Sequence, residues 1–200
     1  MERNELNMAV MGKHSVSTTT PENILLGAGT IHKNLKFEGN KWSGDIIGAT
    51  SGGNKVSIKG EIMDIELDGA LVKVKGLAVK NGGTATLEVN FAELNAEILK
   101  KASLFAEGES DATGYTMLVD KADINEGDYV ENFGFVGKTA NGKKDIVVIF
   151  ENGLCTSGLE LEGKNKENSV IKMTIEAYAN IESDLDTLPV KIYYPETAVV

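Results

Sequence analysis

The sequence predicts an antiparallel, mainly β protein with a single helix, and three observations lead to this fold class. Apolar and polar residues alternate with a period of two in several segments, as in strands with one buried face. Glycine is frequent and proline rare, with 22 and 3 of 200 residues, so many turns and loops are expected. Only one segment has the helical period. A chain of this length is expected to form one domain with a sizeable core.

Three segments carry the strand pattern most clearly. Apolar residues alternate with polar ones over residues 171–181 and again over residues 84–91, which predicts two strands with one dry face. Residues 146–150 are continuously apolar, so we expect a strand that is covered on both faces.

Glycines mark the expected irregularities of the sheet. The alternation slips by one residue beside Gly60 and beside Gly76, and each slip predicts a β-bulge. Turns between neighbouring antiparallel strands are expected at residues 68–69, 81–83 and 141–142, because these Asp-Gly and Asn-Gly pairs suit tight hairpins.

The one helical segment follows the strand at residues 84–91. An apolar stripe recurs at spacings of four and three, formed by Leu94, Ile98, Ala102 and Phe105. Asn95 is the expected N-cap, with Leu94 and Leu99 as a hydrophobic staple across it, and Gly108 lies just past the expected end. We expect about three turns of helix, packed on the sheet by this stripe.

The glycine-rich segment "IGATSGGN", residues 47–54, suggests either a phosphate-binding loop or an arm that contacts something larger. A phosphate-binding loop runs into a helix whose N-terminal amides hold the phosphate. This segment instead runs into "KVSIKGEIMDIELDG", which has the strand pattern. The context therefore disfavours a nucleotide site.

No constellation for catalysis or metal binding is found. "NFGFVGKT", residues 132–139, resembles a Walker A loop, but it lies before a hairpin turn rather than before a helix. His14 and His32 are the only histidines, and neither has a ligand partner at metal spacing. Cys155 is the only cysteine and is expected to be inert, so neither an enzyme nor a cofactor is expected.

Acidic residues dominate the charge. The net charge of −10 disfavours a protein that reads nucleic acid, since that needs clustered Lys and Arg. The acidic clusters at residues 107–111 and 182–186 lack the Gly and Glu of a calcium loop and are expected to be solvated. Four more acids, Glu61, Asp64, Glu66 and Asp68, lie along the bulged strand before the expected hairpin turn. They would repel polyanions if the strand lined a channel, and would only aid solubility if it faced bulk solvent.

The chain has no feature of a secreted or membrane-spanning protein. Its first residues contain acids where a signal peptide has bases, and no window has the ~18 apolar residues of a membrane helix. Together with the single cysteine, this predicts folding in a reducing cytoplasm.

Five segments taken in order resemble the major tail tube protein of long-tailed phages of Gram-positive bacteria. They are "NILLGAGTIHKNL", "DIIGATSGGNKVSI", "DGALVKVKGL", "TATLEVNFAELNAEILKKA" and "LPVKIYY", and they span residues 23–194. The resemblance implies a β-sandwich or small barrel with one flanking helix and a long extended loop. It assigns residues 23–200 to this domain and leaves residues 1–22 as a mobile N-terminal arm.

The resemblance also implies a function. In this family, six subunits join their sheets into a ring, and rings stack into the tail tube through which the genome is ejected. The implied partners are further copies of the chain, the tail-tip initiator, the tail terminator and the tape measure protein, while DNA passes without specific binding. The implied location is the virion tail, with synthesis and assembly in the host cytoplasm.

Two sets of residues follow as candidates for this function. The first is a subunit-interface loop, which we expect to contribute little to its own core, so that deletion of residues 49–53 costs within about 1 kcal/mol; it consists of Ile47, Gly48, Ala49, Thr50, Ser51, Gly52, Gly53 and Asn54. The second is an acidic lumen lining made of Glu61, Asp64, Glu66, Asp68, Glu88 and Glu176.

The alternative from another class is a free-standing β-sandwich binding module, such as a carbohydrate-binding decoration domain. Sugar platforms usually use several aromatic rings. The sequence has one tryptophan, Trp42, and no cluster of aromatic residues along the chain, which disfavours this alternative.

Overall fold

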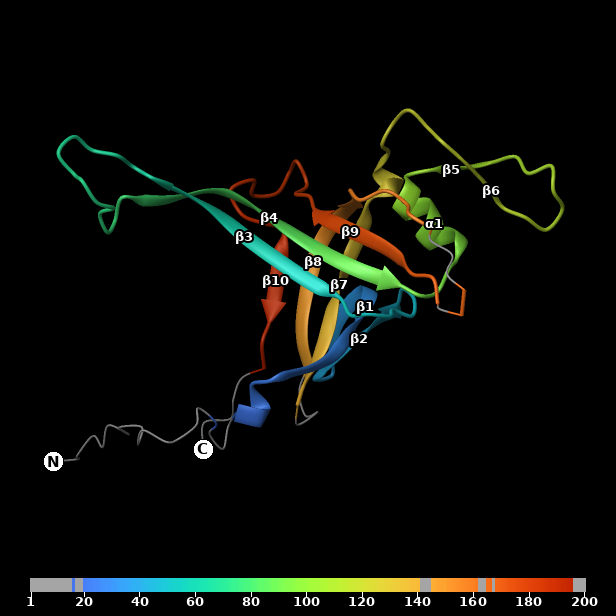
Figure 1. Cartoon of the computed structure of the whole chain (residues 1–200), viewed down its shortest axis with the longest axis horizontal. Coiled ribbons are helices and arrows are strands. Elements are labelled where there is room, and N and C mark those ends of the chain that lie inside the picture. Colours follow the sequence, from blue (N-terminus) through green and yellow to red (C-terminus); the bar gives the residue numbers. More distant parts are fainter. Residues whose placement is uncertain (1–15, 17–19, 141–144, 162–164, 167, 196–200) are drawn as a thin grey trace.

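The computed structural model shows a mainly β protein with eight strands in one antiparallel sheet (Figure 1). It describes the chain except residues 1–15, 17–19, 141–144, 162–164, 167 and 196–200. The strands are β1 (Leu25–Glu38), β2 (Lys41–Ile46), β3 (Lys55–Asp64), β4 (Ala78–Phe91), β5 (Ala106–Gly108), β6 (Met117–Val119), β7 (Val130–Thr139), β8 (Asp145–Cys155), β9 (Ile171–Ala177) and β10 (Val190–Tyr193). The α-helix is α1 (Ala96–Ser103), and two short 3-10 helices are η1 (Thr20–Glu22) and η2 (Glu126–Asp128).

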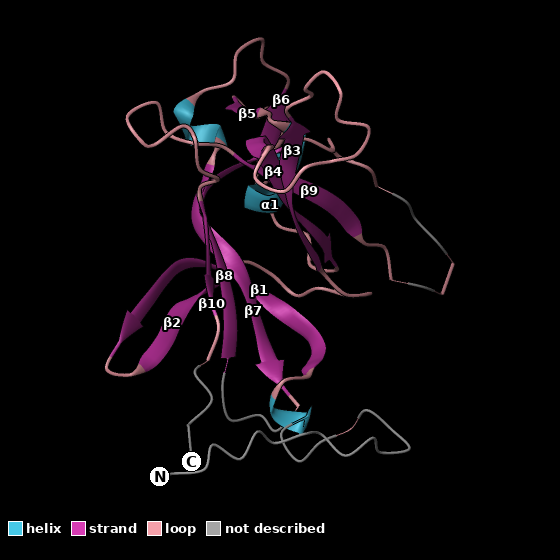
Figure 2. Ribbon diagram, turned by 90° about the vertical axis from the view of Figure 1, so that its left-hand side faces the viewer, coloured by secondary structure: helices cyan, strands magenta, loops and turns pink. Residues whose placement is uncertain are grey.

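The sheet folds into two layers around β8. The strand order is β2-β1-β7-β8-β9-β4-β3, and β10 also pairs with β8. Residues 147–150 of β8 pair with β10, whereas residues 153–155 pair with β9. One layer therefore holds β2, β1, β7 and β10, the other holds β9, β4 and β3, and β8 belongs to both (Figure 2). This confirms the predicted sandwich; the described strands end in free edges at β2 and β3 and close no barrel.

The core lies between these layers and is rich in aromatic rings. Phe133 of β7 and Phe150 of β8 stack with ring centroids 5.0 Å apart, and both are fully buried. Gly153 makes room for this pair, because a Cβ there would lie 2.5 Å from the Phe133 ring. Ile98 and Ala102 of α1 are buried in the same cluster, so the helix packs on the sheet as predicted.

The three predicted strands are present. In β4, residues 85, 87, 89 and 91 are buried in strict alternation. In β8, the neighbours Val147 and Val148 are both buried, which confirms a strand covered on both faces. The segment predicted as a strand over residues 171–181 is shorter than expected, because β9 ends at Ala177 and Ile181 is 90% exposed.

The bulge predictions are partly right. The β3–β4 register shifts between Gly60 and Ile62, as expected. The turn expected at residues 81–83 is wrong: these residues lie inside β4, opposite the bulge, where Gly60 pairs with Gly83. The bulge expected at Gly76 is also wrong, because Gly76 lies in a turn of the loop before β4. The turn expected at residues 141–142 lies outside the described residues.

The helix begins where predicted and ends early. The Asn95 side chain accepts a hydrogen bond from the Ile98 amide at 2.8 Å, which confirms the N-cap. The helix has only eight residues, about two turns. Leu104, not Gly108, takes the left-handed conformation at the C-terminus, with φ of 58°. Gly108 lies in β5 instead.

Candidate assembly surfaces

The most prominent surface feature is a hairpin that leaves the body of the protein. We call residues 61–79 the hairpin arm; they comprise the end of β3, the loop and the start of β4 (Figure 1). The arm is held by its own bonds, including Ile65 N to Leu77 O at 2.9 Å and an ion pair between Lys73 and Asp64 at 2.5 Å. The hydrogen bond and the charge of the half-buried Asp64 raise the pKa of the exposed Lys73 ammonium.

The hairpin arm is apolar and exposed. Leu71 is 98% exposed, Val72 77% and Ile62 73%. The other exposed apolar side chains of the arm are Met63, Ile65, Leu67, Val74 and Val79. Among the described residues, the core cluster and the side chains packed on it include none between Val56 and Ala85. The arm therefore adds nothing to the core of its own chain.

The segment at residues 47–54, unlike the hairpin arm, is bonded to the body of its own chain. Ala49 O accepts from the amide of Ala92 at 2.8 Å, and the Ser51 amide donates to Asn90 O at 2.9 Å. Ile47 packs on the core, and Gly48 is buried in a tight place, since a Cβ would lie 3.0 Å from the Ile98 side chain. None of residues 49–53 is in the core cluster or among the side chains packed on it, but their hydrogen bonds to β4 were not expected from the sequence. The assignment of this segment to a subunit interface stays a prediction.

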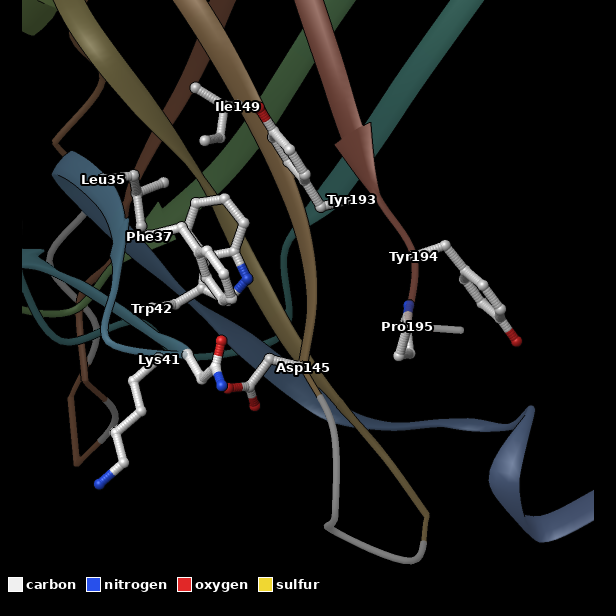
Figure 3. A pocket seen from close by; sticks show the side chains of 10 residues that line it. Leu35, Phe37, Lys41, Trp42, Asp145, Ile149, Tyr193, Tyr194 and Pro195 are labelled. Atoms are coloured by element: carbon white, nitrogen blue, oxygen red, sulfur yellow. The ribbon is translucent and has the colours of Figure 1, made fainter. Parts of the chain in front are cut away.

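A second surface feature is an aromatic cleft that the sequence analysis did not identify. Trp42 of β2 contacts Phe37 of β1 with ring centroids 5.2 Å apart and Tyr193 of β10 at 4.7 Å. Tyr194 lines the same cleft, together with the polar residues Asn40, Lys41 and Asp145 (Figure 3). The expected absence of an aromatic cluster is therefore wrong. Phe37 and Trp42 face each other across the β1–β2 hairpin, whereas the tyrosines at the end of β10 are far away in sequence and are brought to them by the β1–β7–β8–β10 pairings.

Among the described residues, the Tyr194 hydroxyl donates to the Asn23 side chain at 2.7 Å, whereas three other polar side chains of the cleft have no partner there. No hydrogen bond or ion pair there uses the amide of Asn40, the ammonium of Lys41 or the carboxylate of Asp145. Phe37 is 56% exposed and the two tyrosines are also exposed. The cleft thus presents apolar rings beside unused donors and acceptors, which is the composition of a binding site.

The six predicted lumen acids divide between two places. Glu61, Asp64, Glu66 and Asp68 belong to the hairpin arm or its loop. Glu88 lies on β4 and pairs with Lys55 of β3 at 2.5 Å, and Glu176 lies on β9. The register places Glu88 opposite Thr174 and Glu176 opposite Thr86, so both acids lie on the solvent face of this layer.

The chemistry expected to be absent has no counterpart among the described residues. No group of His, Cys, Asp and Glu there is arranged to hold a metal ion. Cys155 is buried, and its thiol lies 3.5 Å from the Ser157 hydroxyl. His32 is partly buried and bonds to the Thr30 hydroxyl at 2.8 Å. His14 lies outside the described residues. Residues 132–139 end strand β7, as predicted for the Walker-like segment.

One buried ion pair serves the structure. Asp128 is 4% exposed and accepts from the Lys121 ammonium and from the Asn125 amide, the latter at 2.7 Å. Burial raises the pKa of Asp128, but these hydrogen bonds and the charges of Lys121 and Lys101 outweigh it and hold the pKa below its usual value. The Lys101 ammonium donates to the carbonyls of Gly127 at 2.5 Å and Tyr129 at 2.8 Å, which ties α1 to η2.

Comparison with known proteins adds little. No family model matches the chain, and no curated protein matches it. A solved structure from the virion of a native gene transfer agent particle is similar over 76% of this chain and 92% of that chain, with 11% identity and a TM-score of 0.40. A similarity this low supports no functional conclusion. Within the described residues, no helix is long and apolar enough to span a bilayer.

Proposed function

We propose that the protein is a structural virion protein, a tail tube subunit that assembles into stacked hexameric rings. The observation that carries this proposal is the hairpin arm, which exposes eight large apolar side chains and packs none of them on its own core. Monomeric proteins rarely expose apolar surface of this extent, and such surface marks a site of protein contact. A second copy of the same chain is the partner that self-assembly requires.

The free edges of the sheet support closure into rings. β2 and β3 each pair on one side only among the described strands. An exposed edge offers unpaired amides and carbonyls, and a strand from a neighbour satisfies them by β-augmentation. When the two joined edges differ, the contact is head-to-tail, and such contacts generate rings or open filaments. The six-fold number and the tube rest on the sequence resemblance.

In this proposal the subunit acts by assembly and not by catalysis. Rings stack between a tail-tip initiator and a terminator, around the tape measure protein, and the genome later passes through without specific binding. The segment at residues 47–54 would lie near a subunit contact, held in place by its bonds to β4. The six acids would keep DNA from adhering where they face the lumen.

A second candidate function is favoured by one specific observation. The aromatic cleft combines four rings with unused polar groups, as carbohydrate-binding modules do. A free-standing binding module would remain a monomer at every concentration and would bind oligosaccharides.

Negative-stain electron microscopy and sedimentation velocity over a wide concentration range test the proposal. We expect a monomer in dilute solution and rings or tubes when the protein is concentrated or added to a tail-tip template. A species that stays monomeric under all of these conditions would contradict the proposed function.

A further inference from the structure

We propose that the aromatic cleft of one copy receives the tip of the hairpin arm of another copy. The inference rests on the proposed function, because it names the surface that an assembling neighbour occupies. It is carried by two features of one chain, an exposed apolar projection and an exposed aromatic cleft, which lie on different parts of the fold (Figures 1 and 3).

The two surfaces match in size. The cleft has a volume of about 1180 Å³, larger than the ~300–1,000 Å³ of a pocket for a small molecule. The arm tip offers Leu71 and Val72, both almost free of contacts, as side chains of a size to enter it. The exposed fractions of the eight apolar residues of the arm add up to close to five whole residues. Burying one such side chain is worth about 1.5–3 kcal/mol, which at ~25 cal/mol per Å² corresponds to roughly 60–120 Å², or roughly 300–600 Å² for the arm. A stable interface buries ~800 Å² on each partner, so the arm supplies a large part of one side.

The surfaces also match in chemistry. Aromatic rings and aliphatic anchors in a desolvated pocket are the usual hot spots of an interface, and hot spots pair with hot spots. At the rim, Lys41 and Asp145 lack partners among the described residues. The arm tip carries Glu66 and Asp68 on one strand of the loop and Lys75 on the other, so each rim charge has a candidate of opposite sign.

The arrangement predicts the kind of assembly. The arm and the cleft are different surfaces, so a copy that uses its arm still has a free cleft. This contact is head-to-tail and continues from copy to copy instead of stopping at a dimer. A sugar in the cleft would explain the rings and polar groups but would leave the hairpin arm uncovered.

Two point variants and one control test the inference. Leu71→Asp damages the arm at a side chain that is 98% exposed, so folding is not at risk. Phe37→Asp damages the cleft, and Tyr115→Asp changes an aromatic ring that is 76% exposed and lies outside both surfaces. We expect each of the first two variants to need a concentration at least about tenfold higher for half-assembly, and the control to assemble as wild type does.

Mixing the two variants is the decisive measurement. The Leu71→Asp protein has an intact cleft and the Phe37→Asp protein an intact arm, so a mixture can form one good contact and then no more. Mass photometry should show particles of twice the mass that either variant forms alone. Absence of this doubled species, or normal assembly of both variants, overturns the inference while leaving the proposed function intact. Wild-type protein that never assembles overturns both.

Tryptophan fluorescence gives an independent readout, because Trp42 is the only tryptophan of the chain. Its emission should shift to shorter wavelength when wild type assembles, and the Leu71→Asp protein at the same concentration should show no shift. This readout stands even where Phe37→Asp folds poorly. A saturable change on addition of chitotetraose to the monomer, with no change on assembly, would identify a sugar site and overturn the inference.

Discussion

Shortening the hairpin arm separates what stabilises one subunit from what joins two. We consider a variant in which residues 66–76 are replaced by Asn-Gly, directly between Ile65 and Leu77. These two residues already form a backbone hydrogen bond at 2.9 Å, so a two-residue turn closes the same ladder. The removed segment contains Leu71 and Val72 but nothing that packs on the core.

The effect on stability follows from loop entropy. The loop falls from eleven residues, 66 to 76, to two, and the closure cost scales as (3/2)RT ln n. The ratio of 11 to 2 gives about 1.5 kcal/mol of stabilisation, which is an upper value because short turns deviate from this law. The lost ion pair between Lys73 and Asp64 is exposed and contributes little. The unfolding temperature should therefore stay the same or rise by about 3–6 °C.

Deleting residues 49–53 should have the opposite effect. Five hydrogen bonds tie this segment to β4 and the residues after it, formed by Ala49 O with the amides of Ala92 and Glu93, by Ala49 N with the Glu93 carboxylate, by Ser51 N and by Gly53 O. At about 0.5–1.5 kcal/mol each, their loss costs roughly 2.5–7.5 kcal/mol. This replaces the sequence-based expectation of a change within about 1 kcal/mol.

Calorimetry on dilute monomer and sedimentation on concentrated protein measure the two effects. The shortened hairpin should unfold like wild type and fail to assemble, and the deletion at residues 49–53 should unfold at lower temperature. A loss of several kcal/mol in the shortened hairpin would refute the reasoning, because it would show that the arm supports its own core. Normal assembly of that variant would refute the role of the arm.

Three further predictions concern stability. Asn95→Ala should cost about 1 kcal/mol in urea unfolding and Asn95→Gly only a few tenths, because glycine is a fair N-cap; equal costs would contradict the cap. Gly153→Ala should cost about 1–3 kcal/mol through overpacking against the Phe133 ring, whereas Gly127→Ala, which has open space, should be neutral. The pKa of Asp128 is depressed, so its contribution is complete above its unfolded value of 3.8 and is lost as pH falls through the folded value. Asp128→Asn should therefore weaken the loss of stability that is measured as the pH falls below 3.8.

The sequence predicted those elements that depend on residues close together in the chain. Alternation identified the second half of β4, which buries one face, and a continuous apolar run identified β8, which is covered on both faces. The N-cap was visible because Asn95 bonds to a backbone amide three residues away. The turn expected at residues 81–83 failed because Gly82 and Gly83 serve a bulge that depends on the partner strand. A glycine in the sequence indicates that the backbone takes a conformation that other residues rarely adopt. Whether that conformation forms a turn or a bulge depends on the pairing of the strands.

The hairpin arm, the segment at residues 47–54 and the aromatic cleft were harder to predict than the strands, because they depend on tertiary structure. The glycines of residues 47–54 suggested freedom, yet Gly48 permits a close approach to Ile98, and Gly52 and Gly53 hold positive φ in a segment that is bonded to β4. The arm at residues 61–79 has the apolar alternation of a buried strand, and only the absence of packing partners reveals its exposure. The aromatic cleft joins the β1–β2 hairpin to β10, and the distance of β10 along the chain hides the cleft from any sequence window.

The charges on the solvent face of β3, β4 and β9 constrain the prediction of an acidic lumen. On this face the register sets Lys55 opposite Glu88, and alternation places Lys59 and Lys172 there as well as Glu176. Three lysines thus accompany two glutamates, and Glu88 is already paired. If this face lines the tube, its local charge is close to zero and slightly positive, so it would not repel DNA. The predicted repulsion then depends on the acids of the hairpin arm outside the proposed contact with the cleft, and replacing Glu61 and Asp64 by Lys should slow genome ejection while the same change at Glu88 and Glu176 should alter it far less. Equal slowing by both pairs would show that the sheet face, and not the arm, carries the effect.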